Sequence, residues 1–237
     1  AREGLYAGMI REALERRGMP QELLYLAAVE SGFSPRATSR VSASGLWQFM
    51  GPTARAFGLR IDGWVDERRD PVRATEAALD YLQSLHDQFD SWYLAAAAYN
   101  AGPGRVARAV RSFDGEVTEE GELYWAIVEH LPRETREYVP KMLAAVLLAQ
   151  AAEDYGFDVE PLKPVRYERV WVPGGVSLRS VAQRAGLPIQ GVRELNPHLI
   201  RGVTPPGALY PVRVPPGSAP AVVASMGSRW KQYLADD

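Results

Sequence analysis

The sequence LLYLAAVES, residues 23–31, is an apolar helical run that ends in one carboxylate, Glu30, followed by a serine. The run predicts a helix over residues 21–31, which ends there because Gly32 and Pro35 force the chain into a loop. Burial beside apolar side chains disfavours the charged form of a carboxyl group, and the negative end of the helix dipole acts in the same direction. We therefore predict a raised pKa for Glu30, as a general acid near neutral pH requires. The alternative is a surface glutamate that closes an amphipathic helix.

Helical patterns dominate the first 155 residues of the chain. The other helices are predicted, in chain order, at residues 5–17, 72–89, 92–101, 105–111 and 134–155. Asp70 is expected to cap the second of them, and Pro140 to kink or break the last. Residues 35–44, rich in Ser, Thr and Arg, form a loop that can hold short strands, and residues 113–121 form an acidic, mobile connection.

Composition limits the class of protein. The chain has 237 residues, 46% of them hydrophobic, which supports one large domain or a large and a small one. No run of about 18 apolar residues occurs, so no membrane span is expected, and the first residues carry no basic and apolar leader. There are no cysteines, which excludes disulfides and thiolate metal sites, and the three histidines lack metal-ligand spacing. We expect neither a metal nor a cofactor.

Charge is divided unevenly along the chain. Residues 1–160 carry 17 Lys and Arg against 25 Asp and Glu, whereas residues 161–237 carry 10 against 4. An acidic first part argues against a nucleic-acid-binding body, and the basic charges of the second part are dispersed rather than clustered. Nucleic acid is therefore not an expected partner.

A second, smaller unit is predicted after residue 156, where the composition changes. Residues 160–164 are Pro-rich and form a linker. The segments predicted beyond it are a strand at residues 167–172, helices from Ser177 and from Ile189, and a strand at residues 209–214. This order gives a small α+β module of the βααβ type, which is expected to fold independently.

Three polar clusters interrupt the apolar patterns of the first part. They are Glu30-Ser31, residues 45–50 (GLWQFM) and residues 98–102 (AYNAG). Gly45 lets a backbone approach a ligand closely, and the amide of Gln48, inside an apolar stretch, needs partners that a sugar can supply. The buried hydroxyl of Tyr99 needs an acceptor, for which a carboxyl group is suitable. Each cluster has a structural alternative, namely a packing glutamine, a core tyrosine and a helix C-cap.

In this order the clusters resemble the motifs of the soluble-type lytic transglycosylase family, as do residues 66–70 (DERRD) and 134–141 (ETREYVPK). The resemblance implies that residues 1–158 form a mainly α, lysozyme-like (α+β) catalytic domain. It implies that Glu30 is the single catalytic acid and that Tyr99 is the catalytic tyrosine that hydrogen-bonds it. It further implies substrate contacts for five residues: Ser31, Ser39, Gln48, Met50 and Asn100.

The reaction implied by the resemblance is cleavage of the β-1,4 bond between N-acetylmuramic acid and N-acetylglucosamine in peptidoglycan. Most glycosidases use two carboxyl groups, but no second acidic residue lies in the motifs. A lone acid is consistent with assistance by the substrate's own N-acetyl group. Glu30 would protonate the leaving oxygen and then take the proton of the C6 hydroxyl, which closes a 1,6-anhydro ring.

Two other functions stay open at this point. A hydrolytic muramidase or chitinase-like enzyme would need a second carboxylate opposite Glu30, and the acidic residues available in sequence are Asp62, Asp66, Glu67 and Asp70. A helix cap is the better explanation of Asp70. A cell-wall-binding protein with an inactive site is the other alternative. The family implies peptidoglycan strands as the partner, residence in the periplasm or cell envelope, a monomer, and a possible membrane anchor outside these residues.

The basic module, residues 165–217, resembles a LysM domain. The supporting segments are residues 175–178 (GVSL), 187–189 (LPI) and 195–197 (LNP). LysM domains hold chains that contain N-acetylglucosamine, but Val176 stands where an acidic residue usually precedes the Ser-Leu pair. The module is therefore expected either to bind glycan or to act as a positioning unit. A tail, residues 218–237, follows, and its residues Trp230, Tyr233 and Leu234 are candidates for a terminal helix.

Overall fold

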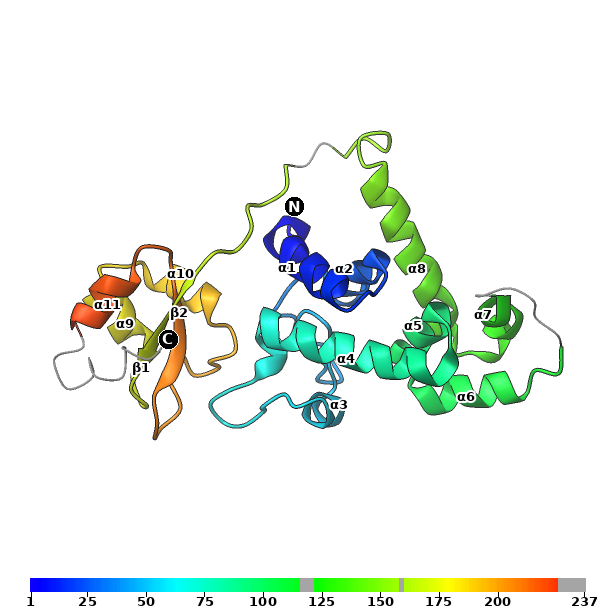
Figure 1. Ribbon diagram of the computed structural model, residues 1–237, viewed down its shortest axis with the longest axis horizontal. Coiled ribbons are helices and arrows are strands. Elements are labelled where there is room, and N and C mark those ends of the chain that lie inside the picture. The colour runs from blue at the N-terminus through cyan, green and yellow to red at the C-terminus, as the bar shows by residue number, and fades with distance from the viewer. Residues whose placement is uncertain (116–121, 158–159, 226–237) are drawn as a thin grey trace.

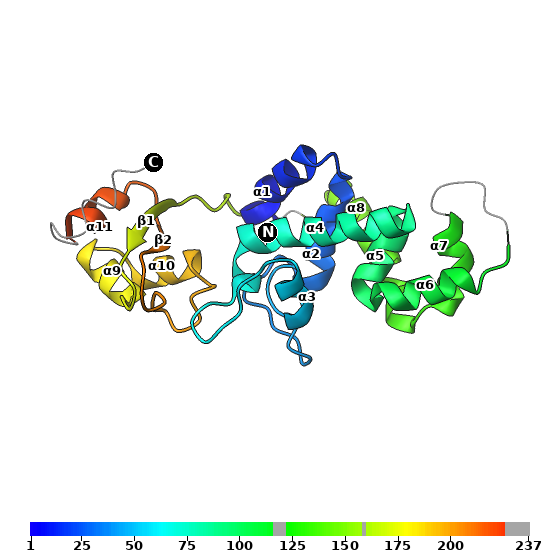
Figure 2. The ribbon, with the colours of Figure 1, turned by 60° about the horizontal axis from the view of Figure 1, so that its bottom comes forward.

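The computed structural model describes residues 1–115, 122–157 and 160–225, which form two units lying side by side (Figures 1 and 2). The first unit is mainly helical, as predicted. Its α-helices are α1 (Glu3–Arg16), α2 (Leu24–Ser31), α3 (Gly51–Ala56), α4 (Pro71–Phe89), α5 (Trp92–Ala101), α6 (Pro103–Arg111), α7 (Glu122–Ile127) and α8 (Arg133–Gln150). Short 3-10 turns, η1 (Gln21–Leu23), η2 (Glu67–Arg69) and η3 (Val128–His130), precede α2, α4 and α8.

Side-chain caps explain where the two central helices begin. The Asp70 carboxylate accepts the backbone N–H groups of Val72 and Arg73, so α4 begins at the predicted place. Ser91 caps α5 by accepting the N–H of Leu94 at 3.4 Å. The predicted bounds of α5, residues 92–101, are confirmed.

Other local predictions need correction. Of the kink or break expected at Pro140, the break does not occur, because α8 packs along both α2 and α5, and this contact outweighs the hydrogen bond that proline removes. A kink there stays a prediction. The helix ends at Gln150, and turns follow to residue 156. The loop at residues 35–44 holds isolated bridges rather than strands. Of the predicted acidic connection, residues 116–121 lie outside the described residues.

The core of the helical unit lies around α4 and α5, with α8 packed against α5 and α2 packed against α8 (Figure 1). The alanines of α5, residues 95–98, are fully buried, so the helix approaches its neighbours closely. Trp47 is also fully buried, and its indole N–H donates to the Thr75 hydroxyl on α4 at 2.9 Å. This bond anchors the loop of residues 35–49 on α4.

The second unit has the predicted βααβ order. Strands β1 (Glu168–Val172) and β2 (Tyr210–Val214) pair antiparallel, with Glu168 opposite Val214 and Val172 opposite Tyr210. Helices α9 (Leu178–Arg184) and α10 (Ile189–Leu195) lie between the strands in sequence, and α11 (Ala219–Ser225) follows them. The helix expected from Trp230 to Leu234 lies outside the described residues. The predicted boundaries of the two domains, at residues 158 and 165, stay a prediction.

Backbone hydrogen bonds join the module to the loop that precedes α4. The N–H of Asp66 donates to His198 O at 2.9 Å, and the N–H of Ile200 donates to Trp64 O at 3.1 Å. Between these bonds, the fully buried Val65 packs into the core of the module. The chain leaving α8 returns across α1, where Val165 N–H donates to Leu5 O at 3.1 Å (Figure 1). The two units are therefore joined by packing as well as by the linker.

A buried ion pair lies at the centre of this contact. The guanidinium of Arg213, on β2, donates to both oxygens of Asp70 at 2.8 and 2.7 Å. His198 Nδ1 lies 3.5 Å from the same carboxylate, and both Asp70 and His198 are 4% exposed. Burial lowers the pKa of His198 to about 4 despite the opposing effect of Asp70, so the ring is neutral near pH 7. The Asp70 side chain therefore both caps α4 and binds the module.

Candidate active site

The last turn of α2 carries Glu30 to a partly exposed position beside α8. The helix ends there because Gly32 adopts the left-handed conformation, with φ +57°. The Tyr138 hydroxyl, on α8, donates to Glu30 Oε1 at 2.6 Å. Burial raises the pKa of the Glu30 carboxyl to about 7, opposed by the bond from Tyr138 and reinforced by the charge of Glu134. The raised pKa predicted from the sequence therefore has burial as its main cause.

The expected hydrogen bond between Tyr99 and Glu30 is a prediction that the structure corrects. The Tyr99 hydroxyl donates instead to Trp47 O at 2.9 Å, because the buried indole holds that carbonyl against α5. Tyr138 makes the bond to the carboxylate. Burial raises the pKa of both tyrosines, and the Glu30 charge raises each further, so the three side chains form one electrostatic cluster. A catalytic role for Tyr99 stays a prediction.

A second carboxylate, Glu134, lies one turn before Tyr138 on α8. The Asn100 amide, at the end of α5, donates to Glu134 Oε1 at 3.4 Å and accepts the Thr135 hydroxyl at 2.8 Å. Asn100 thus holds the start of α8 in place, and its predicted contact with substrate stays a prediction. Glu134 is exposed and close enough to raise the pKa of Glu30. Sequence reasoning missed Glu134 and Tyr138 as site residues, although their spacing of four places them on one helix face.

The loop of residues 35–49 is fixed beside the end of α2 by polar side chains. The Ser31 hydroxyl donates to Leu46 O at 2.7 Å and accepts the Ser34 N–H at 3.0 Å. These bonds use the hydroxyl within the protein, and substrate contact by Ser31 stays a prediction. The Gln48 amide nitrogen donates to Gly45 O at 2.8 Å and to Ala37 O at 3.3 Å. Backbone bonding of this glutamine was the structural alternative.

Two further predicted substrate residues lie at the surface of the same region. The Ser39 hydroxyl accepts the Ala43 N–H at 3.0 Å within a tight turn, which leaves its proton able to donate. Met50 is 44% exposed just before α3. Substrate contact by Ser39, Gln48 and Met50 stays a prediction.

Gly45 is the position at which this loop tolerates no side chain. Its φ is +86°, and a Cβ there would lie 1.7 Å from Arg68 O. We expect Gly45→Ala to lower the free energy of unfolding by more than about 2 kcal/mol, because a left-handed backbone and a clash with backbone act together. Gly58→Ala is the matched control, since Gly58 has φ +76° and open space around it. If urea unfolding gave the same loss of stability for both variants, the close approach of residue 45 to Arg68 would not contribute to the effect.

The acidic residues considered as partners of Glu30 are engaged elsewhere. Asp62 accepts the N–H groups of Trp64 and Val65, which lowers the pKa of its carboxyl to about 2. Asp66 pairs with Arg68 at 2.8 Å. Glu67 accepts the Arg60 N–H at 2.8 Å, and Asp70 pairs with Arg213. Within the described ranges, no three His, Asp or Glu side chains gather as metal ligands do, and no helix is long and apolar enough to cross a bilayer.

Comparison with known proteins identifies the two domains of this chain. Residues 8–120 match the family model of the transglycosylase SLT domain, and residues 166–227 match the model of the LysM-like domain of lytic transglycosylase MltD. Residues 8–120 therefore form a transglycosylase SLT domain. The resemblance inferred from the motifs is thereby confirmed, and the βααβ module is of the LysM-like type found in MltD.

Two relatives of this chain are lytic murein transglycosylases. Membrane-bound lytic murein transglycosylase D of Escherichia coli K12 is 37% identical over 193 residues, which are 81% of this chain and 42% of the relative. The soluble lytic murein transglycosylase of the same strain is 32% identical, over 59% of this chain and 22% of the relative. The chain therefore spans less than half the length of these relatives.

A solved structure supports the fold of the SLT domain. The complex of the 70-kDa soluble lytic transglycosylase with bulgecin A is similar to this chain, with a TM-score of 0.51 and 29% sequence identity. The similarity covers 66% of this chain and 25% of that one. The mainly helical, lysozyme-like fold class predicted from the sequence is confirmed.

Proposed function

We propose that this chain cleaves the β-1,4 bond between N-acetylmuramic acid and N-acetylglucosamine in peptidoglycan, with Glu30 as its single acid and base. The product would carry a 1,6-anhydro-N-acetylmuramic acid end. The observation that carries the proposal is the Glu30 carboxyl, whose pKa is raised to about 7 by burial and which accepts a 2.6 Å bond from Tyr138. A carboxyl group with such a pKa is protonated often enough near neutral pH to act as an acid.

The reaction proceeds in two proton transfers. Protonated Glu30 gives its proton to the glycosidic oxygen, the bond from that oxygen to C1 breaks, and N-acetylglucosamine leaves as an alcohol. The N-acetyl oxygen of the substrate stabilises the cation left at C1. Ionised Glu30 then takes the proton of the C6 hydroxyl, whose oxygen bonds to C1 and closes the anhydro ring. No water is consumed, and Glu30 ends protonated as it began.

Tyr138 would support both states of the carboxyl group. Its hydroxyl donates to Glu30, so it stabilises the ionised form that arises after the first transfer. Tyr99, held by Trp47, would complete the polar wall beside the acid.

Hydrolysis is the second candidate, and Glu134 favours it. Glycosidases that use water need a second carboxylate, either as a nucleophile or as a base that activates the water. Glu134 is exposed and electrostatically coupled to Glu30. Its bond from Asn100 and its place beside Tyr138 on α8 are equally consistent with a residue that raises the Glu30 pKa.

Mass spectrometry of digested peptidoglycan separates these two functions. The transglycosylase reaction yields anhydro ends, each one water lighter than the reducing ends that hydrolysis gives. We expect anhydro ends from the wild-type chain and from Glu134→Gln alike. Reducing ends that disappear in Glu134→Gln would establish the hydrolase instead.

Tyr138→Phe tests the hydrogen bond to the acid. We expect the alkaline limb of the pH–rate profile to move to higher pH, because the lost bond had favoured the ionised form of Glu30. We expect kcat to fall about tenfold or more, since a hydrogen bond to a charged group contributes about 1.5–3 kcal/mol. Tyr99→Phe is the comparison, because its hydroxyl bonds to Trp47 O. A Tyr138→Phe profile that coincides with wild type would contradict this role.

The proposed substrate also indicates the setting in which the chain works. Peptidoglycan strands as the partner imply residence in the periplasm or cell envelope, which the membrane-bound relative supports. We propose that the chain acts as a monomer. We propose that the LysM-like module positions the catalytic domain. The contact between the two includes a buried ion pair of Asp70 with Arg213 and the buried side chain of Val65.

A further inference from the structure

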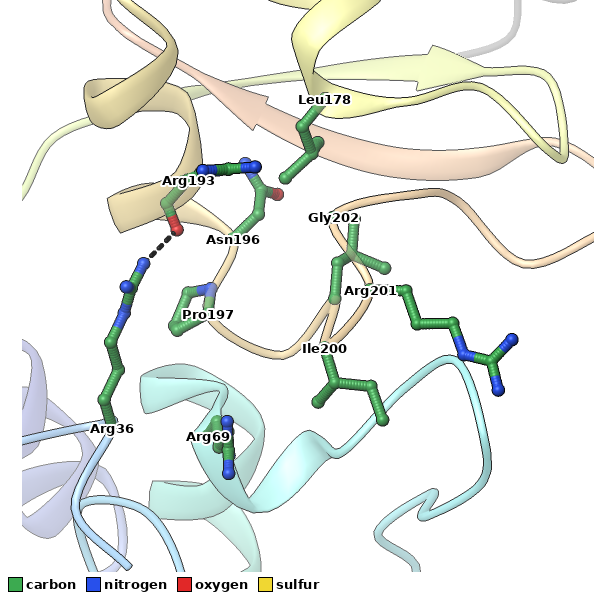
Figure 3. Close-up of a pocket in the computed structure, with 10 residues that line it drawn as sticks. Arg36, Arg69, Leu178, Arg193, Asn196, Pro197, Ile200, Arg201 and Gly202 are labelled. Atoms are coloured by element: carbon green, nitrogen blue, oxygen red, sulfur yellow. Dashed lines mark hydrogen bonds between the residues drawn. The ribbon is translucent and has the colours of Figure 1, made fainter.

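A pocket lies between the helical unit and the module, apart from the proposed catalytic residues. Its volume is about 260 Å³. Four arginines from both units line it: Arg36, Arg69, Arg193 and Arg201. Figure 3 shows Arg36, Arg69 and Arg193 around the hollow and Arg201 directed outward at its edge. No acidic residue is among its lining residues.

Few of these arginines form ion pairs within the protein. Within the described residues, Arg36, Arg193 and Arg201 form no ion pair within 4 Å, and Arg69 reaches one oxygen of Asp66 only at 3.9 Å. Glu194, next to Arg193 in sequence, does not line this pocket, but it lines a neighbouring hollow together with Arg36. A concave site with several guanidinium groups and no carboxylate attracts anions, which arginine binds in a bidentate manner.

Contacts within the protein hold three of these arginines in place. Arg36 donates to the backbone oxygen of Arg193 at 2.7 Å, which links loop and module across the pocket (Figure 3). Arg69 donates to Ser44 and Thr38 hydroxyls, each at 3.4 Å. Arg201 stacks over the ring of Trp64, 4.7 Å from its centre. Less side-chain freedom is therefore lost when a ligand binds.

Besides Asn196 and Gly202, the rest of the lining is apolar, which narrows the class of anion that fits. Leu178, Pro197, Leu199 and Ile200 contribute to the wall, and Ile200 is 43% exposed. An aliphatic chain that carries a carboxylate can contact both the apolar wall and the arginines, whereas a bare phosphate can contact only the arginines. The volume lies just below the about 300–1000 Å³ of sites for drug-sized ligands, so it suits a segment of peptide rather than a disaccharide.

We propose that this pocket binds a free carboxylate of the peptide stem carried by N-acetylmuramic acid, an inference that rests on the proposed function. The pocket adjoins the loop of residues 35–49, because Arg69 bonds to Thr38 and Ser44 of that loop. The same loop carries Ser39 and Gln48, which are predicted to contact the glycan. A strand held there by its sugars brings its stem peptides toward the arginines.

The test uses Arg36→Gln/Arg193→Gln and, alone, Arg193→Gln, which keeps the backbone oxygen that Arg36 contacts. Arg179→Gln is the matched control, because Arg179 is exposed on α9 and does not line the pocket. Binding is measured in a Glu30→Gln background, so that no probe is cut. The probes are the disaccharide N-acetylglucosaminyl-N-acetylmuramic acid bearing a tetrapeptide, the same compound with its peptide carboxylates amidated, and inorganic phosphate.

We expect the double variant to raise the Kd for the carboxylate probe about tenfold, and Arg193→Gln to raise it less, since each lost charge-assisted bond weakens binding. Arg179→Gln should leave the Kd unchanged, and the amidated probe should bind weakly to every variant. Unchanged binding by the double variant, equal binding of the amidated probe, or displacement of the carboxylate probe by equimolar phosphate would overturn the proposal. Thermal unfolding confirms that each variant is folded.

A second readout separates this inference from the proposed function. In the active chain, the ratio of cleavage rates for peptide-bearing and peptide-free strands should fall about tenfold in the double variant. A ratio equal to that of wild type would count against the pocket while leaving the reaction intact. Binding of the carboxylate probe that depends on the arginines, in a chain that cuts no strand, would instead count against the reaction alone.

Discussion

Glu30→Gln should reduce cleavage of peptidoglycan by about 10³-fold or more, because one residue supplies both proton transfers and each is worth about 10²–10⁴-fold in typical enzymes. The substitution keeps the size of the side chain and an oxygen that can accept the Tyr138 hydroxyl. Loss of rate would therefore reflect the missing proton and not a rearranged site. The measurement is the release of soluble fragments from purified peptidoglycan, with products identified by mass.

The same substitution should stabilise the fold at high pH. The pKa of the Glu30 carboxyl is about 7 in the folded chain and 4.5 ordinarily, so the folded state binds more protons between these values. Stability due to this group falls as the pH rises from about 4.5 to 7, and the loss is complete above 7. We expect Glu30→Gln to raise the free energy of unfolding at pH 8 by about 1–3 kcal/mol.

Glu22→Gln is the control for both effects, because Glu22 is exposed at the start of the same helical segment. It should change neither the rate nor the stability by a measurable amount. An active Glu30→Gln variant would remove Glu30 as the acid. A variant that is inactive but less stable at pH 8 would show that burial of the ionised Glu30 carboxylate does not destabilise the folded chain.

The acid could be predicted from the sequence because its determinants are local. An apolar helical run, one carboxylate and the stop at Gly32 lie within ten residues, and the structure keeps them together. The helices from Pro71 and Trp92 were predictable for the same reason, since their caps are adjacent in sequence. The six-residue helices α3 and α7 were missed because so short a segment shows no helical period.

The partner of the acid could not be predicted, because packing between distant elements selects it. Tyr99 and Tyr138 both lie on helices beside Glu30, and Tyr138 is 108 residues away along the chain. Only the course of α8 along α2 brings the Tyr138 hydroxyl to the carboxylate. The family motif drew attention to Tyr99, whose hydroxyl serves the loop through Trp47 instead.

The contact between the two units was equally invisible in the sequence. Arg169 and Arg213 face each other across the β1–β2 pair, yet Arg169 is exposed and Arg213 is 8% exposed. An alternating strand pattern predicts the same environment for both. The start of α4 lies against Arg213 and not against Arg169. Asp70 pairs with Arg213 there, and the ion pair is buried.

Arg213→Leu should therefore lower the free energy of unfolding by about 3–5 kcal/mol, the usual cost of leaving one charge of a buried pair without its partner. Burial raises the pKa of the Asp70 carboxyl, but Arg213, His198 and the backbone N–H groups outweigh it and leave the pKa below its ordinary value. Without Arg213 the effect of burial is no longer offset by that charge, so the pKa of the Asp70 carboxyl should rise. Urea unfolding at pH 7 measures the loss.

Arg169→Leu on the neighbouring strand is the control, and it should change stability by no more than about 0.5 kcal/mol, as exposed substitutions do. Asp70→Asn removes the charge but keeps a capping side chain for α4. In the double variant Asp70→Asn/Arg213→Leu, part of the loss should be recovered, because neither charge is then buried alone. Strictly additive losses would mean that Asp70 and Arg213 do not stabilise each other, and that other contacts, such as those of Val65 and the backbone bonds, hold the module to the catalytic domain.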